Sequence, residues 1–241
     1  MNRFQPTAII TGASSGIGLA LTKGYLDAGY RVVATARTAS TAGTLSASAE
    51  LALVDGDIGE RATAVRVADT AIERFGRIDV LINNAGIFVP RAFTDITAED
   101  YERVLATNLH GFFHMTQETL RRMVGKNPGH VLSISTTLVE QPIRGLNAFL
   151  TSATKGAINA ATKQLALEYV EQGIRFNAIA AGIIDTPMHQ PESHAALKGF
   201  HPIARLGRVE EVLDAALFLT RAEFITGELL NLDGGAHAGK W

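Results

Sequence analysis

The sequence predicts one α/β domain, in which a doubly wound parallel sheet carries helices on both faces. Three observations favour this fold class. Apolar runs typical of buried strands alternate with helical patterns along the whole chain. A glycine-rich turn joins the first strand to the first helix. The chain has 241 residues, 46% of them hydrophobic, which is enough for one large domain with a core on each side of its sheet.

Taken in order, the apolar runs predict seven strands, at residues 8–10, 31–36, 51–54, 80–83, 130–135, 175–180 and 229–232. The patterns between them predict five helices, at residues 16–28, 60–75, 97–125, 152–172 and 209–219, the third broken near Thr107. No repeat or interdomain linker interrupts this order, so we expect residues 1–241 to form a single domain. Residues 38–50 have little apolar periodicity, and we interpret them as a loosely packed surface connection, with a flap over a bound ligand as the alternative.

The composition excludes several kinds of function. A net charge of −2 offers no basic surface for nucleic acid or for an anionic membrane. The absence of cysteine excludes disulfides, thiolate catalysis and cysteine-bound metal. Residues 1–6 lack the apolar segment of a signal peptide, and no apolar run is long enough to span a bilayer. We therefore expect a cytoplasmic protein that acts on a small molecule and has no nucleic-acid or membrane partner.

The turn after the first strand predicts a phosphate site. The N-terminus of a helix offers unpaired N–H groups and the positive end of its dipole, and glycine lets a ligand approach the backbone closely. The strand before the turn, the helix after it and a second strand at residues 31–36 supply the context that such a site needs. We expect the phosphates to contact Gly12, Ser14, Ser15, Gly16, Ile17 and Gly18.

The spacing of this turn, Thr-Gly-x-x-x-Gly-x-Gly, resembles that of the short-chain dehydrogenase/reductase family. Further motifs follow in the family's order over essentially the whole chain: Asn83-Asn84-Ala85-Gly86, Asn108, Ser133-Ile134-Ser135-Thr136, Lys155 and Asp233-Gly234-Gly235. The resemblance implies a Rossmann fold that binds NAD or NADP and transfers a hydride.

The residue after the second strand favours NADP over NAD. In dinucleotide folds this position faces the ribose 2′ oxygen, where a carboxylate accepts a bond from a hydroxyl and a guanidinium binds a phosphate. Neither Ala36 nor Arg37 is acidic, so we expect Arg37 to bind the 2′-phosphate of NADP.

The resemblance also implies contacts with the rest of the cofactor. Asp57 would meet the adenine amino group and Ile58 would pack on the adenine ring. The remaining contacts, with the riboses, the pyrophosphate and the nicotinamide, fall to Asn84, Ala85, Gly86, Lys155, Gly182, Ile184 and Thr186.

The family's catalytic residues are a Ser, a Tyr and a Lys, the last two spaced Tyr-x-x-x-Lys on one helix face. Lys155 matches the lysine, but Thr151 stands in the tyrosine position. Thr136 matches the serine, with Thr137 as a close rival, and Asn108 matches an asparagine whose carbonyl holds a water linked to the lysine. A threonine hydroxyl falls several ångströms short of a phenol's reach, and loss of one general acid costs on the order of 10²–10⁴ in rate.

The stretch at about residues 183–205 is expected to form a lid over the substrate. It carries His189, His194 and His201, any of which could supply the proton that the tyrosine would have given, because an unperturbed imidazole titrates near neutral pH. The alternative, which we favour, is that these histidines face solvent. Their spacing fits no compact set of metal ligands, so we expect no metal.

Two functions remain open. The first is an NADP(H)-dependent oxidoreductase acting on a small carbonyl or alcohol, an imine or an enone; the second is a non-catalytic NADP-binding sensor or partner-binding protein. Retention of Asn108, Thr136 and Lys155 favours the enzyme, whereas Thr151 favours the binder.

The resemblance further implies a homodimer or homotetramer formed through residues 107–125 and 152–172. The small residues of the second segment could face a second copy or pack on the sheet: Ala153, Gly156, Ala157, Ala160 and Ala161.

Overall fold

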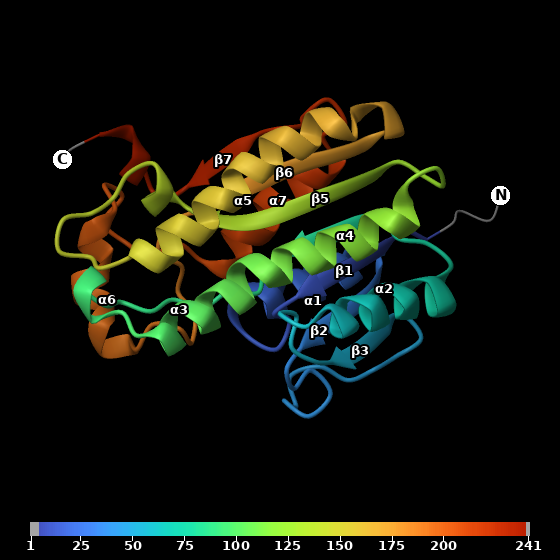
Figure 1. Ribbon diagram of the computed structural model, residues 1–241, viewed down its shortest axis with the longest axis horizontal. Coiled ribbons are helices and arrows are strands. Elements are labelled where there is room, and N and C mark those ends of the chain that lie inside the picture. Colours follow the sequence, from blue (N-terminus) through green and yellow to red (C-terminus); the bar gives the residue numbers. More distant parts are fainter. Residues whose placement is uncertain (1–4, 240–241) are drawn as a thin grey trace.

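A computed structural model describes residues 5–239 and shows a parallel sheet between two layers of helices (Figure 1). The sheet has seven strands in the order β3-β2-β1-β4-β5-β6-β7. Their bounds are β1 Thr7–Thr11, β2 Arg31–Ala36, β3 Leu51–Asp55, β4 Val80–Asn83, β5 Gly129–Thr136, β6 Ile174–Ala181 and β7 Leu229–Leu232. The predicted fold class is confirmed.

Helices cover both faces of the sheet. Helices α2, α4 and α5 lie on the near face in Figure 1, and α1 and α7 lie behind it; α3 continues into α4, and the short α6 belongs to the segment before α7. The bounds are α1 Gly16–Asp27, α2 Arg61–Phe75, α3 Ala98–Val104, α4 Gly111–Met123, α5 Phe149–Glu168, α6 His194–Leu197 and α7 Val209–Arg221. Within residues 5–239, no helix combines the length and the apolar character needed to cross a bilayer.

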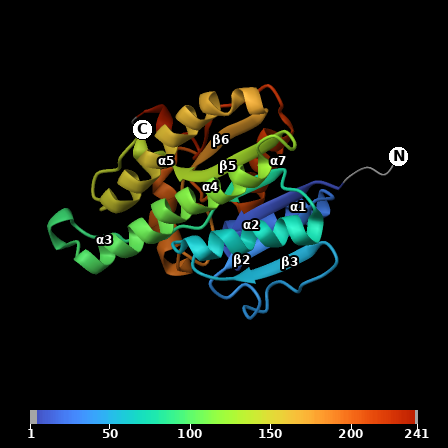
Figure 2. The same cartoon turned by 45° about the vertical axis from the view of Figure 1, so that its right-hand side comes forward.

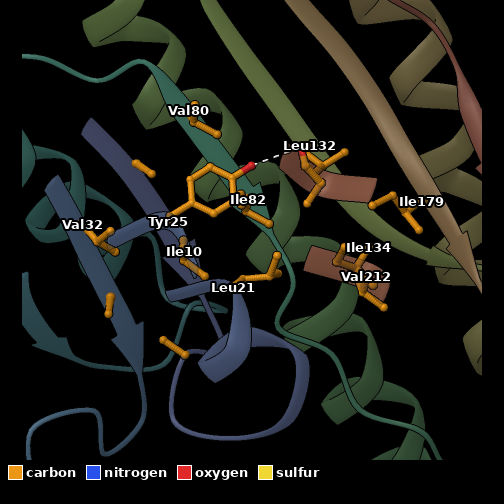
Figure 3. Packing of buried hydrophobic residues seen from close by; sticks show 14 of the residues in the cluster. Ile10, Leu21, Tyr25, Val32, Val80, Ile82, Leu132, Ile134, Ile179 and Val212 are labelled. Carbon is orange, nitrogen blue, oxygen red and sulfur yellow. Dashed lines mark hydrogen bonds between the residues drawn. The ribbon is translucent and has the colours of Figure 1, made fainter. Parts of the chain in front are cut away.

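Alternate side chains of the central strand enter two separate cores, because neighbouring residues of a strand point to opposite faces. Ile10 packs on the side of α1 and α7, whereas Ile9 packs on the side of α2 and α4. In the first core Tyr25 lies among aliphatic side chains (Figure 3), and its hydroxyl donates to Ala216 O at 3.2 Å. Complete burial on both faces explains the continuous apolar runs of the sequence.

The order of the strands reverses at β1. The chain builds β2 and β3 on one side of β1 and then returns to build β4 on the other, so Ile10 pairs with Ala34 and with Ile82. At such a reversal the loops leaving the carboxyl ends of neighbouring strands separate and leave a crevice for a ligand. The fold therefore brings the first glycine turn next to the residues that follow β4.

The predicted break in the third helix is confirmed. A π-helical turn, Leu105–His110, joins α3 to α4 and has Asn108 buried within it.

Residues 37–50 contain neither helix nor strand, as their weak periodicity indicated. Hydrogen bonds that hold this connection include those from Ser40 to Asp55, from Thr44 Oγ1 to Ser14 O at 3.1 Å and from Arg74 Nη2 to Ser48 O at 2.8 Å.

Residues 183–205 lie beyond the carboxyl ends of β6 and β7, at the same end of the molecule as the start of α5 (Figures 1 and 2). Besides α6, they contain single helical turns at Pro191–Ser193 and Lys198–Phe200 and an isolated parallel bridge between Ile184 and Gly207. Their function as a substrate lid stays a prediction.

Candidate active site

The glycine turn fits a phosphate group. Ser15 precedes α1 in an extended conformation and makes no side-chain cap, so its side chain leaves the first N–H groups of α1 free for a ligand. Gly16 has a φ of +51°, and a Cβ at Gly18 would lie 2.1 Å from Gly12 O. Side chains at these two positions would destroy the turn. Ser14 lies in the turn between Gly12 and Gly16. Ile17, which follows Gly16, contacts the first core.

The strand ends on either side of the crevice are bonded to each other through Thr11 and Asn84. Asn84 Nδ2 donates to Thr11 O at 2.8 Å, and the N–H groups of Asn84 and Ala85 both donate to Thr11 Oγ1 at 3.0 Å. Thr11 was not among the predicted site residues, and only its place in the Thr-Gly motif could have indicated it.

The residues predicted for the adenosine end lie at the ends of β2 and β3. Arg37 is exposed directly after β2, and the exposed Asp57 accepts a bond from Gly59 N at 2.8 Å. Ile58 instead turns its side chain into the second core against Gly111, where a Cβ would lie 2.5 Å from Ile58 Cδ1. An adenine ring could therefore meet the backbone of Ile58, but little of its side chain.

A buried lysine lies at the other end of the crevice. Lys155 Nζ donates to Ile134 O at 2.6 Å. A Cβ at Gly86 would lie 3.4 Å from Lys155 Nζ and 3.4 Å from Asn108 Oδ1, so the fold brings these three residues together. Burial lowers the pKa of Lys155 to about 8, because the ammonium loses its hydration.

The side chain of Asn108 forms hydrogen bonds with the loop after β4 and with α5. Its Nδ2 donates to Ile87 O at 3.1 Å and to Thr154 Oγ1 at 3.2 Å, while its Oδ1 accepts from Ile87 N at 2.9 Å. The π-helical turn thus joins the loop after β4 to α5. The predicted water on the backbone carbonyl of Asn108 stays a prediction.

The two candidate threonines at the end of β5 differ in their bonding. Thr137 is buried and donates to Asp233 Oδ2 at 2.7 Å. The half-buried Thr136 accepts from Leu138 N at 3.3 Å, which leaves its own hydroxyl proton for another acceptor. Of the two hydroxyls, only that of Thr137 donates to another side chain in the described part of the chain, and the match of Thr136 to the family serine stays a prediction.

Thr151 lies one turn before Lys155 on α5. Its residue is 7% exposed, and its buried Oγ1 has no hydrogen-bond partner among residues 5–239. An unpaired buried hydroxyl lowers the stability of the folded protein, so the Thr151 side chain is unfavourable at this position.

The structure contradicts the favoured expectation that His201 faces solvent, and the bonds of its ring disfavour the alternative role of a proton donor. The residue is 4% exposed, its Nε2 accepts from Ile183 N at 2.9 Å, and its Nδ1 donates to Arg205 O at 2.9 Å. Both ring nitrogens are therefore occupied.

His189 and His194 are half-buried. Burial lowers the pKa of His189, and the charge of the nearby His194 lowers it further. Neither forms a hydrogen bond with Thr136, Thr151 or Lys155 in the described part of the chain.

The loop after β6 reaches the glycine turn. Gly182 N donates to Leu232 O at 2.9 Å, which anchors the start of the loop on β7. Ile184 is buried in the first core, and a Cβ on Gly16 would lie 3.2 Å from Thr186 Cβ. Thr186 thus lies beside the predicted phosphate site. No cluster of three or more potential metal ligands occurs within residues 5–239.

The strand reversal, the glycine turn and the buried lysine define a protein of the Rossmann class. The chain belongs to the short-chain dehydrogenase/reductase family: a family model described as enoyl-(acyl carrier protein) reductase matches residues 12–237.

Its relatives cover nearly the whole chain. Granaticin polyketide synthase putative ketoacyl reductase 2 of Streptomyces violaceoruber is 35% identical over 96% of each chain. The NADP-bound structure of ElxO has a TM-score of 0.87 at 27% identity and covers 98% of this chain and 100% of its own. A 3-ketoacyl-(acyl-carrier-protein) reductase from Brucella melitensis, complexed with NADH, has a TM-score of 0.88 at 28% identity and covers 96% and 98%.

Proposed function

We propose that this protein is an NADP(H)-dependent oxidoreductase that acts on a small carbonyl or alcohol, an imine or an enone. The observation that carries the proposal is the buried Lys155 beside Gly86 and Asn108, in a fold whose first turn suits a phosphate group. A protein that only bound a dinucleotide could use this ammonium for the ribose, but it would not need the buried Asn108 to hold a water beside the lysine.

The residues present fit a nicotinamide dinucleotide. The uncapped start of α1 suits its pyrophosphate, and Thr186 borders the same turn. The exposed Arg37 suits a 2′-phosphate, which favours NADP, although the solved relatives include one complexed with NADH as well as one with NADP.

When bound, NADPH would supply the hydride, and the chain must then supply the proton. The free hydroxyl proton of Thr136 can bond a substrate oxygen and orient it. Lys155 Nζ uses one donor on Ile134 O, which leaves N–H groups for the ribose and for a water on Asn108. With a pKa of about 8, Lys155 is mostly protonated at pH 7 and can release a proton into that water.

Thr151 limits which substrates this site suits. A ketone needs a proton at its oxygen as the hydride arrives, and the short side chain of Thr151 cannot reach that oxygen as a phenol would. An imine that is already protonated, or an enone whose carbon accepts the hydride, depends less on that acid. We therefore favour such substrates over a simple ketone.

Thr151 also supports a second candidate function, a non-catalytic NADP-binding sensor or partner-binding protein. Its hydroxyl is buried and unpaired within the described residues, so it offers no acid to a substrate. In this alternative the crevice would bind the cofactor without turning it over.

The outward face of α5 supports a homo-oligomer. Ala153, Ala157 and Ala160 are exposed, whereas Lys155 and Ile158 face the sheet. Of the two alternatives for these small residues, contact with a second copy is therefore favoured over packing on the sheet. Phe113 of α4 is also exposed, so we propose that α4 and α5 form the contact in a homodimer or homotetramer.

The test is NADPH oxidation against ketones, aldehydes, imines and enones, with wild type and Thr151→Tyr in parallel. Turnover of an imine or enone by the wild type supports the enzyme. Turnover by Thr151→Tyr alone shows an intact pocket in a protein that has lost carbonyl chemistry, which supports the binder. Fluorescence titration shows whether NADPH binds at all, and failure to bind contradicts both candidates.

A further inference from the structure

His201 connects three segments that lie far apart in the sequence. Its imidazole bonds to Ile183 and Arg205 through opposite ring nitrogens, each at 2.9 Å. A Cβ at Gly182 would lie 2.6 Å from His201 Nε2, and a Cβ at Gly234 would lie 3.2 Å from His201 Cβ. The ring therefore fills the space between the loop after β6 and the glycines after β7.

The hydrogen bonds determine the tautomer. Ile183 N–H can only donate, so Nε2 must carry a lone pair; Arg205 C=O can only accept, so Nδ1 must carry the proton. The neutral Nδ1–H imidazole satisfies both bonds. A second proton would make Nε2 a donor that faces another donor, and the bond to Ile183 would be lost.

The turn that carries His201 is strained. Ala204, between His201 and Arg205, has a φ of +48°, a left-handed conformation that a residue with a Cβ seldom adopts. Ala204 N donates to His201 O at 2.9 Å, and Ile203 N donates to Gly234 O at 3.1 Å. The bond from His201 Nδ1 to Arg205 O closes the same turn, so loss of the ring's bonds would release strained backbone.

The ring borders a cavity of about 270 Å³, through which a proton can reach it. Arg205, Glu211, Asp233 and His237 line the same cavity. Burial lowers the pKa of His201, and the positive charge of Arg205 lowers it further. The hydrogen bond to the Arg205 carbonyl and the negative charge of Asp233 act in the opposite direction and raise the pKa. The net effect keeps the ring neutral at pH 7.

We propose that His201 is a positioning residue, whose neutral ring holds the loop 182–186 in its cofactor-binding conformation and releases the loop when the ring takes up a proton. The inference rests on the proposed function, because that loop carries Gly182, Ile184 and Thr186, which we assign to the cofactor. It predicts that affinity for NADPH falls on mild acidification.

Three variants separate the contributions. In His201→Gln an amide oxygen can accept from Ile183 N–H and does not titrate, whereas His201→Leu fills the space without an acceptor. His110→Gln is the matched control, because His110 is an exposed histidine on the π-helical turn, outside the lid. Dissociation constants for NADPH are measured by fluorescence from pH 5.5 to 8.

For the wild type and His110→Gln, we expect constant affinity above pH 7 and a loss of about tenfold as the ring ionises. On acidification His201→Gln should lose about tenfold less affinity than His110→Gln, because only the titration of the 2′-phosphate of NADPH then remains. At pH 8 His201→Leu should bind about tenfold more weakly than the wild type. A loss of affinity on acidification that is as large in His201→Gln as in His110→Gln would overturn the proposal, and this comparison remains valid even if His201→Leu does not fold.

Measurements without cofactor separate this proposal from the proposed function. Ring ¹⁵N spectra should show a neutral Nδ1–H tautomer, and the Ile183 amide should lose hydrogen-exchange protection on acidification in the wild type but not in His201→Gln. A proton on Nε2 at neutral pH, or equal protection in both proteins, would contradict the inference. If the wild type binds no dinucleotide, the proposed function fails, while these spectra still decide whether His201 holds the loop.

Discussion

At the scale of single residues, side-chain hydrogen bonds between distant loops hold the candidate site: Thr137 bonds to Asp233, and His201 bonds to Ile183. Lys155, Asn108 and Gly86 were predicted from their order in the chain, and the fold brings them together. The roles of His201 and Thr137 could not be predicted, because their partners Ile183 and Asp233 lie 18 and 96 residues away. Side-chain hydrogen bonds between distant loops leave no periodic signal in a sequence.

Thr151 gives the first prediction at this scale. Replacing it with valine removes an unpaired buried hydroxyl and keeps the shape of the side chain, so the free energy of unfolding should rise by about 1 kcal/mol. Urea denaturation measures the change. Thr154→Val is the matched control on the same helix: its hydroxyl donates to Leu150 O and accepts from Asn108, so this variant should lose about 1–2 kcal/mol. A lower stability of Thr151→Val would show that its hydroxyl has a partner.

Lys155 gives a pH-dependent prediction. Burial lowers its pKa from 10.5 to about 8, so between these values the unfolded chain binds a proton that the folded chain does not. The free energy of unfolding should therefore rise from pH 8 to 10.5 by about 2–3 kcal/mol relative to Lys155→Met. Parallel curves for the two proteins would mean that the lysine is hydrated.

At the scale of the elements, the seven strands follow the prediction closely because the inner strands are largely apolar and buried, and the half-buried edge strand β7 still has an apolar run. The break near Thr107 was predicted and observed, although its π-helical form was not. The short turns of residues 183–205 could not be predicted, because single helical turns have no apolar face. Their conformation depends on contacts such as those of His201.

Asn108 provides the prediction at this scale. Asn108→Ala removes the partners of both Ile87 backbone groups and of the Thr154 hydroxyl. We expect the free energy of unfolding to fall by about 2 kcal/mol, measured by urea denaturation, and the loop after β4 to exchange its amides faster. Asn127→Ala is the control, because its amide also bonds to backbone carbonyls but lies before β5, away from the crevice. Unchanged exchange at Ile87 in Asn108→Ala would contradict the assigned role.

At the scale of the whole molecule, the exposed alanines of α5 and Phe113 of α4 lie on the outer surface of one helical layer. Ala157→Arg places a charged side chain on this surface, so we expect the oligomer to dissociate to monomers of 25.7 kDa in light scattering. Ser46→Arg adds the same charge in the exposed connection before β3 and should leave the assembly intact. An intact oligomer in Ala157→Arg would place the contact elsewhere.

The bond between Thr137 and Asp233 affects how the protein is made. During synthesis β1 and β4 leave the ribosome early. Asp233, whose carboxylate accepts the bond from Thr137 at the end of β5, leaves it 96 residues after Thr137. Until then the Thr137 hydroxyl lacks the acceptor that it has in the complete fold, and the loop after β6 lacks the β7 carbonyl that anchors Gly182. A chain that stops short of Asp233 would thus have its glycine turn but lack the bonds that hold the end of β5 and the loop after β6, and we expect proteases to cut it there.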